Sequence, residues 1–265
     1  MKNVLAALDL DECARPVLGT AVALARLLDA TPVALHVHEP GIASPIELAH
    51  AAGVQLHEAS GTPIVQIVAA AREPEVAALV LGTRGQPRGP QPAGHTAIEV
   101  ITHLAKPVAV APPHAQPPEQ FTRVLVPLEG TSESSRALAD TISLAHRREL
   151  EIVVLHVHSP ATVPAFSDHE PHATQAWDRE FLARHLAAPP ENVKLLRHLG
   201  APAQLVAAIA DEATADLLVL AWNQDLARGR GQVVSETLAH SNIPVLLLPV
   251  LNRHRSSKRS KAAAR

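Results

Sequence analysis

Short runs of apolar residues alternate along the chain with longer segments in which apolar residues recur at helical spacing. The run Val4–Leu8 has no polar residue, which is typical of a strand buried on both faces. Residues 13–30 follow at helical spacing, and Pro16 falls early enough to lie in the first turn of a helix. The run Pro32–Val37 predicts the next strand. This alternation indicates strands joined by helices.

The same alternation continues to about residue 112. A strand is expected at residues 54–57, and Thr62 followed by Pro63 has the order of an N-cap and a first helical residue. The remaining predicted elements are a strand at Ala78–Gly82, a helix at Thr96–Leu104 and a strand at Pro107–Pro112. Because parallel strands need crossover helices, the pattern predicts the α/β class, with a doubly wound parallel sheet.

The whole pattern occurs twice. "VLAALDL" from Val4 returns as "VLVPLEG" from Val124, which pairs Asp9 with Glu129. Further landmarks recur in the same order: "ALHVHEP" as "VLHVHSP", "SGTP" as "LGAP", "LVLG" as "LVLA" and "KPVAVAPP" as "IPVLLLPV". Matching residues lie 120 positions apart at first, then 139 and finally 137. We interpret this as two copies of one domain that differ by insertions and deletions.

The repeat defines the expected domains. We predict a first domain at residues 1–114 and a second at residues 121–251, joined by a proline-rich linker at residues 115–120. The second copy carries a helical segment at residues 172–188 that the first copy shortens. Residues 252–265 are basic and lack an apolar face, so we expect a disordered tail. The tail has no aromatic residue for stacking on bases and does not favour nucleic-acid binding.

Composition narrows the class of protein. Apolar residues make up 47% and aromatic residues only 2%, which suits helices packed on parallel strands. A formal net charge of −3 gives no electrostatic basis for binding nucleic acid or an anionic membrane. No apolar run approaches the roughly 20 residues of a membrane span, and the N-terminus lacks a signal-peptide pattern. We therefore expect a soluble cytoplasmic protein. The single cysteine, Cys13, excludes an internal disulfide and a cysteine-based zinc site.

The first strand ends in Asp9 and Asp11, the arrangement in which phosphatases of the haloacid-dehalogenase type present a nucleophile and a general acid. The second copy keeps neither residue and has Glu129 instead. No carboxylate pair that could hold magnesium follows the strand Ala78–Gly82. Covalent phosphoryl transfer is therefore not predicted.

The ordered landmarks resemble those of a known family. They are the strand-end acids, the "LHV" strands, the "G-x-P" helix starts, "LVLGTRG" and the terminal "KPVAVAP" and "IPVLLLP" strands. Each half resembles a universal stress protein domain, so the chain resembles a tandem member of that family. The resemblance implies a five-stranded parallel sheet of order 3-2-1-4-5 in each half, similar to the adenine-nucleotide alpha-hydrolases. It also implies that the terminal strands of the two halves meet across a pseudo-twofold axis.

The resemblance further implies an adenine-nucleotide site, for ATP or a related nucleotide, at the carboxyl ends of strands 1 and 4. The nucleotide loop of the family follows the pattern G-x2-G-x9-G-(S/T). The first copy matches it with Gly82, Gly85 and Gly94, but the loop is one residue short, and His95 and then Thr96 follow the last glycine. Glycines let backbone N–H groups approach phosphate oxygens, and the next helix offers its positive N-terminal end.

Other residues of this loop act in opposite directions. Pro87, Pro90 and Pro92 remove N–H donors, whereas Arg84 and Arg88 supply charged donors for phosphate. We therefore expect a degenerate site in the first copy, which binds nucleotide weakly or not at all.

The second copy departs further from the pattern. It reads Ala221-Trp222-Asn223-Gln224 where the glycines are expected, and only Gly231 is kept. Side chains in this loop would block the approach of a phosphate. We predict that the second copy has no nucleotide site.

At the other end of the site, the resemblance places Asp9 against the adenine and Val37 in an apolar wall. A second interpretation of Asp9 is that it caps the following turn or helix. Both interpretations stay open at this point. Glu129 in the second copy is longer and fits the capping role better.

His36 and His38 form a His-x-His pair on a strand, and the pair recurs at His156 and His158. Alternate strand residues point to one face, a geometry that metal sites use. The only histidines that recur as a third ligand, His103 and His240, lie on the last helix of each copy. We interpret the pairs as ordinary strand histidines and predict no metal site. Cys13 has no resolving cysteine, so a redox role is not predicted.

The function implied by the resemblance is a stress-response binding or regulatory module without catalytic residues. It would act through a signalling partner that the sequence does not identify, either as a single chain or as a homodimer. The alternative is an enzyme that slowly hydrolyses ATP or transfers a nucleotide at the first site. Asp9, Asp11 and His95 are the attacking groups available for that chemistry.

Overall fold

The computed structural model describes residues 1–38, 43–83, 93–128, 132–158, 171–186, 193–226 and 230–250. The first half contains β1 (Asn3–Ala7), α1 (Ala14–Leu28), β2 (Thr31–His38), α2 (Ile46–Ala51), β3 (Gln55–Ser60), α3 (Pro63–Arg72), β4 (Val76–Gly82), α4 (His95–His103) and β5 (Val108–Ala111). The second half contains β6 (Arg123–Pro127), α5 (Ser132–Arg147), β7 (Glu151–His158), α6 (Pro171–His185), β8 (Val193–Leu199), α7 (Pro202–Glu212), β9 (Leu217–Trp222), α8 (Arg230–His240) and β10 (Val245–Pro249).

These elements follow the predicted alternation. The helices predicted to start at Pro63 and Pro202 do so, and both prolines occupy the first helical position. Thr62 is the N-cap of α3, although its side chain makes no capping hydrogen bond. The third strand is longer than predicted, because β3 extends to Ser60 in parallel pairing with β2.

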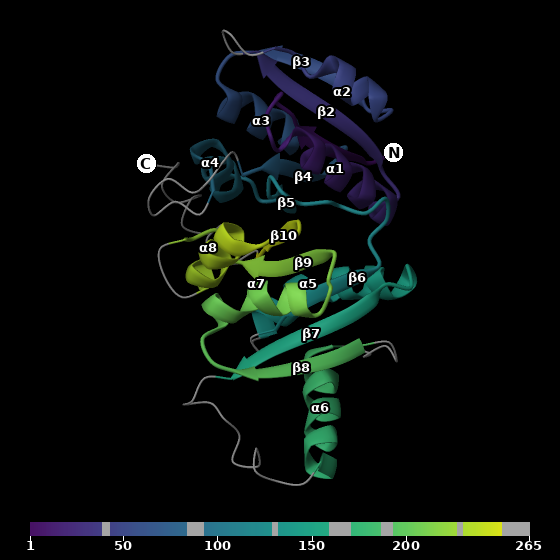
Figure 1. The fold of residues 1–265 in the computed structure, drawn as a ribbon, viewed down its shortest axis with the longest axis vertical. Helices are drawn as coiled ribbons and strands as arrows, with labels where there is room; N and C mark the ends of the chain where they lie inside the picture. The colour runs from purple at the N-terminus through teal and green to yellow at the C-terminus, as the bar shows by residue number, and fades with distance from the viewer. Residues whose placement is uncertain are drawn as a thin grey trace, which may run out of the picture.

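The ten strands form one sheet of order β3-β2-β1-β4-β5-β10-β9-β6-β7-β8 (Figure 1). Each half therefore has the predicted order 3-2-1-4-5, and within each half the strands are parallel. The two terminal strands pair antiparallel, with Leu246 opposite Ala109. The predicted meeting of the terminal strands is confirmed. The pairing gives each of these apolar edges a hydrogen-bonded neighbour.

Helices cover both faces of the sheet, and two apolar clusters fill the layers between. One cluster joins α1, α2, α5 and α6 to the sheet, and the other joins α3, α4, α7 and α8 to the opposite face. The strand β1 contributes to both, because Val4 and Leu5 point to opposite faces. Each cluster contains residues from both halves, so the core is continuous along the molecule.

The linker predicted at residues 115–120 packs against the first half. A Cβ atom at Gly19 of α1 would lie 2.7 Å from Pro117 Cγ, which shows how closely the linker crosses the helix. Arg26 donates a hydrogen bond to the carbonyl oxygen of Glu119 at 2.7 Å. The domain boundaries stay a prediction, and the predicted basic tail lies outside the described residues.

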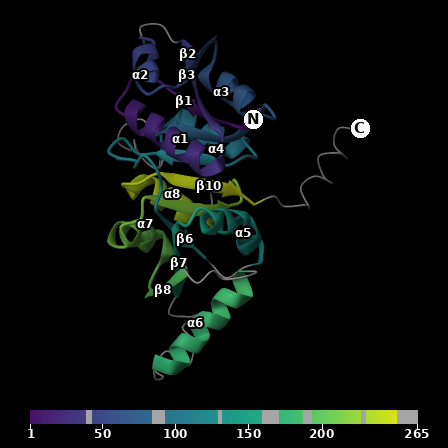
Figure 2. The same ribbon diagram turned by 90° about the vertical axis from the view of Figure 1, so that its right-hand side faces the viewer.

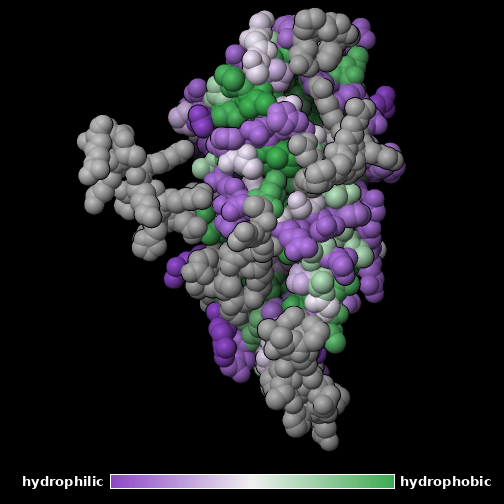
Figure 3. Space-filling model, turned by 90° about the vertical axis from the view of Figure 1, so that its left-hand side faces the viewer, coloured by the Kyte–Doolittle hydropathy of each residue, from purple (hydrophilic) through white to green (hydrophobic). Residues whose placement is uncertain are grey.

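The surface view in Figure 3 is mostly hydrophilic, with hydrophobic residues gathered along the middle of that face. The helix α6 extends away from the sheet beyond β8 (Figures 1 and 2). Within the described part of the chain, no helix is both long and apolar enough to cross a membrane.

Candidate functional site

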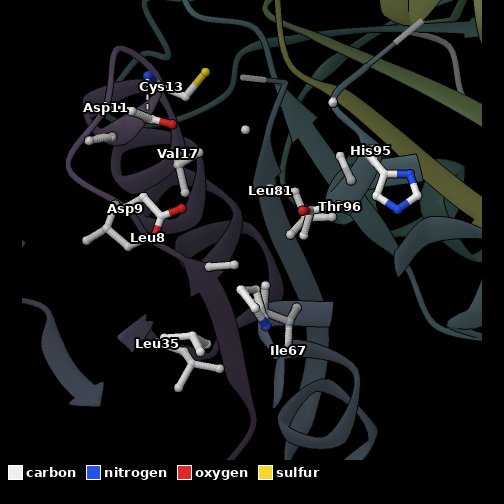
Figure 4. Close-up of a pocket in the computed structure, with 17 residues that line it drawn as sticks. Leu8, Asp9, Asp11, Cys13, Val17, Leu35, Ile67, Leu81, His95 and Thr96 are labelled. Atoms are coloured by element: carbon white, nitrogen blue, oxygen red, sulfur yellow. Dashed lines mark hydrogen bonds between the residues drawn. The ribbon is translucent and has the colours of Figure 1, made fainter. Parts of the chain in front are cut away.

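A pocket of about 260 Å³ lies at the carboxyl ends of β1 and β4, where the strand order of the first half reverses (Figure 4). Ligands of open α/β sheets bind at such switch points, because the flanking crossover helices lie on opposite faces of the sheet and leave a crevice. Three regions line the pocket: the segment from β1 to α1, the ends of β2 and α3 that face it, and the junction of β4 with α4.

The acidic end of the pocket is formed by Asp9 and Asp11. The Asp9 Oδ1 atom lies 3.3 Å from His36 Nδ1, and His36 is fully buried. The same Nδ1 atom lies 3.0 Å from the carbonyl oxygen of Leu8. Because a carbonyl oxygen only accepts, we assign the ring proton to Nδ1, which donates to Leu8 and faces the Asp9 carboxylate. His36 thus holds the end of β1 and the Asp9 side chain in place.

Asp11 has a local structural role. Its Oδ1 atom accepts a hydrogen bond from the backbone N–H of Cys13 at 2.9 Å, just before α1 begins. Burial raises the pKa of the Asp11 carboxyl group above its ordinary value, and its hydrogen bonds from Cys13 and Ala14 act in the opposite direction. The carboxylate at the start of α1 is therefore tied to the helix terminus.

The pocket wall is apolar. Val37 and Leu35 from β2, Ile67 from α3 and Leu81 from β4 line it, and all four side chains are buried. Figure 4 shows Leu35 and Ile67 at one side and Leu81 beside Thr96. Such a wall suits the flat apolar faces of a ring system.

The opposite end of the pocket is the N-terminus of α4. Gly94 is the N-cap residue, and His95 and Thr96 open the helix. The first N–H groups of a helix have no intrahelical partner and carry partial positive charge, so this end favours an anion. In Figure 4, Thr96 lies next to Leu81, and His95 lies on the side away from Asp9 and Asp11.

Glycine is required at position 82 because β4 packs closely against α1. A Cβ atom at Gly82 would lie 2.5 Å from Cys13 Cβ, a distance that real side chains do not reach. The sequence linked Gly82 to the approach of a phosphate, and the structure adds the close contact of β4 with α1. Cys13 itself is buried and lines the pocket.

The equivalent point of the second half, between β6 and β9, has a pocket of only about 50 Å³. It is built from matching positions: Val157 stands for Val37, and Ala221 stands for Gly82. Every described residue that lines it is apolar. The two halves thus share one fold, but the second pocket is smaller, and its described lining lacks the polar side chains found in the first.

Comparison with known proteins gives the family. Residues 120–249 match the Universal stress protein family. The second half of the chain therefore belongs to the universal stress protein family. None of the curated proteins compared with it matches.

Two solved structures extend the likeness of fold to the whole chain. A functionally unknown protein from Pseudomonas aeruginosa PAO1 is 12% identical over 98% of each chain, with a TM-score of 0.68. A universal stress protein from Archaeoglobus fulgidus DSM 4304 is 18% identical over 94% of this chain and 96% of that chain, with a TM-score of 0.64.

The structure brings most of the predicted site residues together. Those that line the pocket are Asp9, Val37, Gly82, Gly94, His95 and Thr96. Arg84 and Gly85 lie outside the described residues. Sequence reasoning missed the apolar lining, such as Leu35, Ile67 and Leu81. Leu81 lies near the end of β4, but Ile67 lies in the middle of α3, so no signal in the sequence marked it as part of the site.

The two rings of each histidine pair lie edge to face, and each ring also has contacts of its own. The Nδ1 atom of His156 lies 2.8 Å from the carbonyl oxygen of Leu128, which repeats the contact between His36 and Leu8. His38 is half exposed, and its Nε2 atom lies 3.7 Å from Glu58 Oε1. The described residues contain no group of three or more His, Cys, Asp or Glu side chains that could hold a metal ion.

Proposed function

We propose that this universal stress protein is a regulatory module that binds one adenine nucleotide, ATP or a close relative, in its first half. The second half holds none. The protein acts in the cytoplasm through a signalling partner, and binding rather than turnover is its function.

The observation that carries the proposal is the difference between the two equivalent pockets. The first measures about 260 Å³ and has polar groups at two ends, whereas the second measures about 50 Å³ and has an apolar lining in the described residues. A ligand with an apolar ring system and an anionic tail fits the first pocket alone.

The polarity of the first pocket matches the parts of a nucleotide. The buried side chains around Val37 face the base, and the Asp9 carboxylate can accept a hydrogen bond from an exocyclic amino group. The N-terminus of α4 at Gly94 offers unpaired N–H groups to phosphate oxygens. This placement is the one that the family resemblance implies for the two ends.

Weak binding is expected. Pro87, Pro90 and Pro92 cannot donate N–H groups to a phosphate, and the loop is one residue shorter than the family pattern. Each lost charge-assisted hydrogen bond is worth about 1.5–3 kcal/mol, so we propose an affinity weaker than micromolar.

Binding without turnover is supported by the positions of the acids. Asp9 and Asp11 lie at the end of the pocket opposite the α4 N-terminus, where the phosphates are proposed to bind (Figure 4). Asp11 is also hydrogen-bonded to the start of α1. Neither carboxylate is placed to attack a phosphate.

The two halves provide a matched pair of variants for a test. Val37→Phe puts a larger side chain into the first pocket, and Val157→Phe does the same at the equivalent position of the second. We expect calorimetric titration with ATP to show weak binding to the wild type and to Val157→Phe. Val37→Phe should abolish it, because the added ring fills the space of the base.

Circular dichroism of both variants controls for folding. Loss of ATP binding in a folded Val157→Phe variant, with binding kept in Val37→Phe, would place the site in the wrong half. Absence of binding in the wild type would reject the nucleotide function itself.

A further inference from the structure

The loop after β9 takes the place of a nucleotide loop in the second half. Residues 221–224 stand 139 positions after residues 82–85, so Gln224 occupies the position of Gly85. Trp222 at the end of β9 is 2% exposed and is among the largest fully buried side chains. It belongs to the apolar cluster that contains Ile101 and Leu104 at the end of α4. The loop therefore begins inside the core shared by the two halves.

Gln224 connects the loop directly to the first half. Its Nε2 atom donates a hydrogen bond to the carbonyl oxygen of Leu104 at 2.8 Å, in a partly buried contact. Leu104 is the C-cap residue of α4, and the last carbonyl groups of a helix have no intrahelical partner. The cross-half contact thus supplies a donor to the C-terminal end of α4.

The backbone of Gln224 is shaped for this contact. Its φ is 61°, in the left-handed region that glycine adopts easily and other residues rarely adopt. A glycine at this position would keep the turn without strain but could not reach Leu104. The contact with Leu104 therefore depends on the side chain of Gln224.

The same loop closes over the start of α8. A Cβ atom at Gly231 would clash with the backbone oxygen of Asp225 and would lie 2.7 Å from Leu226 Cα. The backbone of the loop occupies the space beside the first turn of α8, which is where an anion would approach that helix. The loop after β9 therefore contacts the start of α8 at the place where a nucleotide loop would contact a phosphate.

We propose that Gln224 is a positioning residue for the nucleotide site of the first half and acts through α4. The helix spans His95–His103; Gln224 binds its C-terminal end, and its N-terminal residues Gly94 and Thr96 line the pocket. The former nucleotide loop of the second half is a brace that fixes the distance of α4 from Asp9. The ligand part of this inference rests on the proposed function, whereas the brace itself does not.

The test uses the full-length protein and the substitution Gln224→Gly. Glycine accepts the φ of 61°, so the change removes the hydrogen bond without straining the turn. We expect faster deuterium uptake in the peptide that covers α4 and a dissociation constant for ATP raised roughly three- to tenfold, the range for one net hydrogen bond. Gln224→Lys keeps a donor of similar reach and should restore both values.

Glu149→Gly is the matched control. Glu149 also has a left-handed φ, of 58°, but lies in the exposed turn before β7. Unchanged α4 exchange in Gln224→Gly, or an equal change in Glu149→Gly, would overturn the brace. Faster α4 exchange with unchanged ATP affinity would overturn the positioning role. A wild type that binds no ATP rejects the proposed function separately, and the exchange measurement then still decides on the brace.

Discussion

Thr237 on α8 is fully buried, and its hydroxyl group has no hydrogen-bond partner among the described residues. Burying a hydroxyl group without a partner costs about 1–3 kcal/mol. The first half has the equally buried Val100 at the equivalent position. We predict that Thr237→Val raises the free energy of unfolding by about 1 kcal/mol, measured by urea denaturation.

Thr102 provides the comparison. Its hydroxyl group donates to backbone oxygens of Ile98 and Glu99, each at 3.0 Å. Thr102→Val removes a satisfied group and should leave the stability unchanged or lower. A destabilised Thr237→Val variant would contradict the account of its unpaired hydroxyl group.

For single residues, the sequence predicted the kind of role better than it predicted the contacts. The repeated His36 and His156 were recognisable as strand histidines, but their shared contact with the carbonyl oxygen at the end of the neighbouring strand depends on register. Gly82 was assigned to phosphate approach from its motif. Its contact with Cys13 comes from how closely α1 crosses β4, which no local pattern encodes.

At the scale of elements, α6 is held to the sheet by rings and charges. Trp177 and Phe181 on the helix pack against His156 and His158 on β7. Arg197 on β8 lies over the Trp177 ring and pairs with Asp178 of α6 at 3.0 Å. The helix itself was predicted from the sequence at residues 172–188. Its ring contacts were not, because they require β7, β8 and α6 to be placed together.

This cluster predicts a dependence of stability on pH. Burial lowers the pKa of His158 below its ordinary value of 6.5, and the charges of His156 and Arg197 lower it further. The unfolded chain therefore binds a proton at a higher pH than the folded protein does. Stability should fall as the pH drops below about 6.5 towards the lower pKa of the folded state.

We expect the unfolding temperature of the wild type to drop between about pH 7.5 and about pH 5.5. The unfolding temperature of His158→Phe should drop less, because this variant lacks the imidazole group that gains the proton. His38→Phe, at the matching position of the first half, is the control. An equal drop of the unfolding temperature in the wild type and in His158→Phe would show that protonation of His158 does not cause the pH dependence.

At the scale of the whole molecule, the pairing of β5 with β10 makes one sheet from the two halves (Figure 1). The strand order could be predicted from the resemblance to the family, and the pairing could be predicted because the apolar edge of each terminal strand must be covered. The site residues at the strand ends, Asp9, Val37 and Gly82, were predicted in the same way. The loop with Arg84 and Gly85 lies outside the described residues, so this part of the site stays a prediction.

The shared core predicts one cooperative unfolding transition. Trp222 is buried within the apolar cluster common to both halves. In a Trp177→Phe variant, its fluorescence reports on this region alone. We expect urea transitions followed by Trp222 fluorescence and by far-ultraviolet circular dichroism to coincide. Two separate transitions would mean that the halves unfold independently.

We propose that two copies of one fold have diverged, so that only the first holds a nucleotide. A crystal structure of the full chain grown with ATP tests it most directly. We expect one nucleotide per chain, with its base against Val37 and its phosphates at the N-terminus of α4 near Thr96. A nucleotide between β6 and β9, or one in each half, would contradict it.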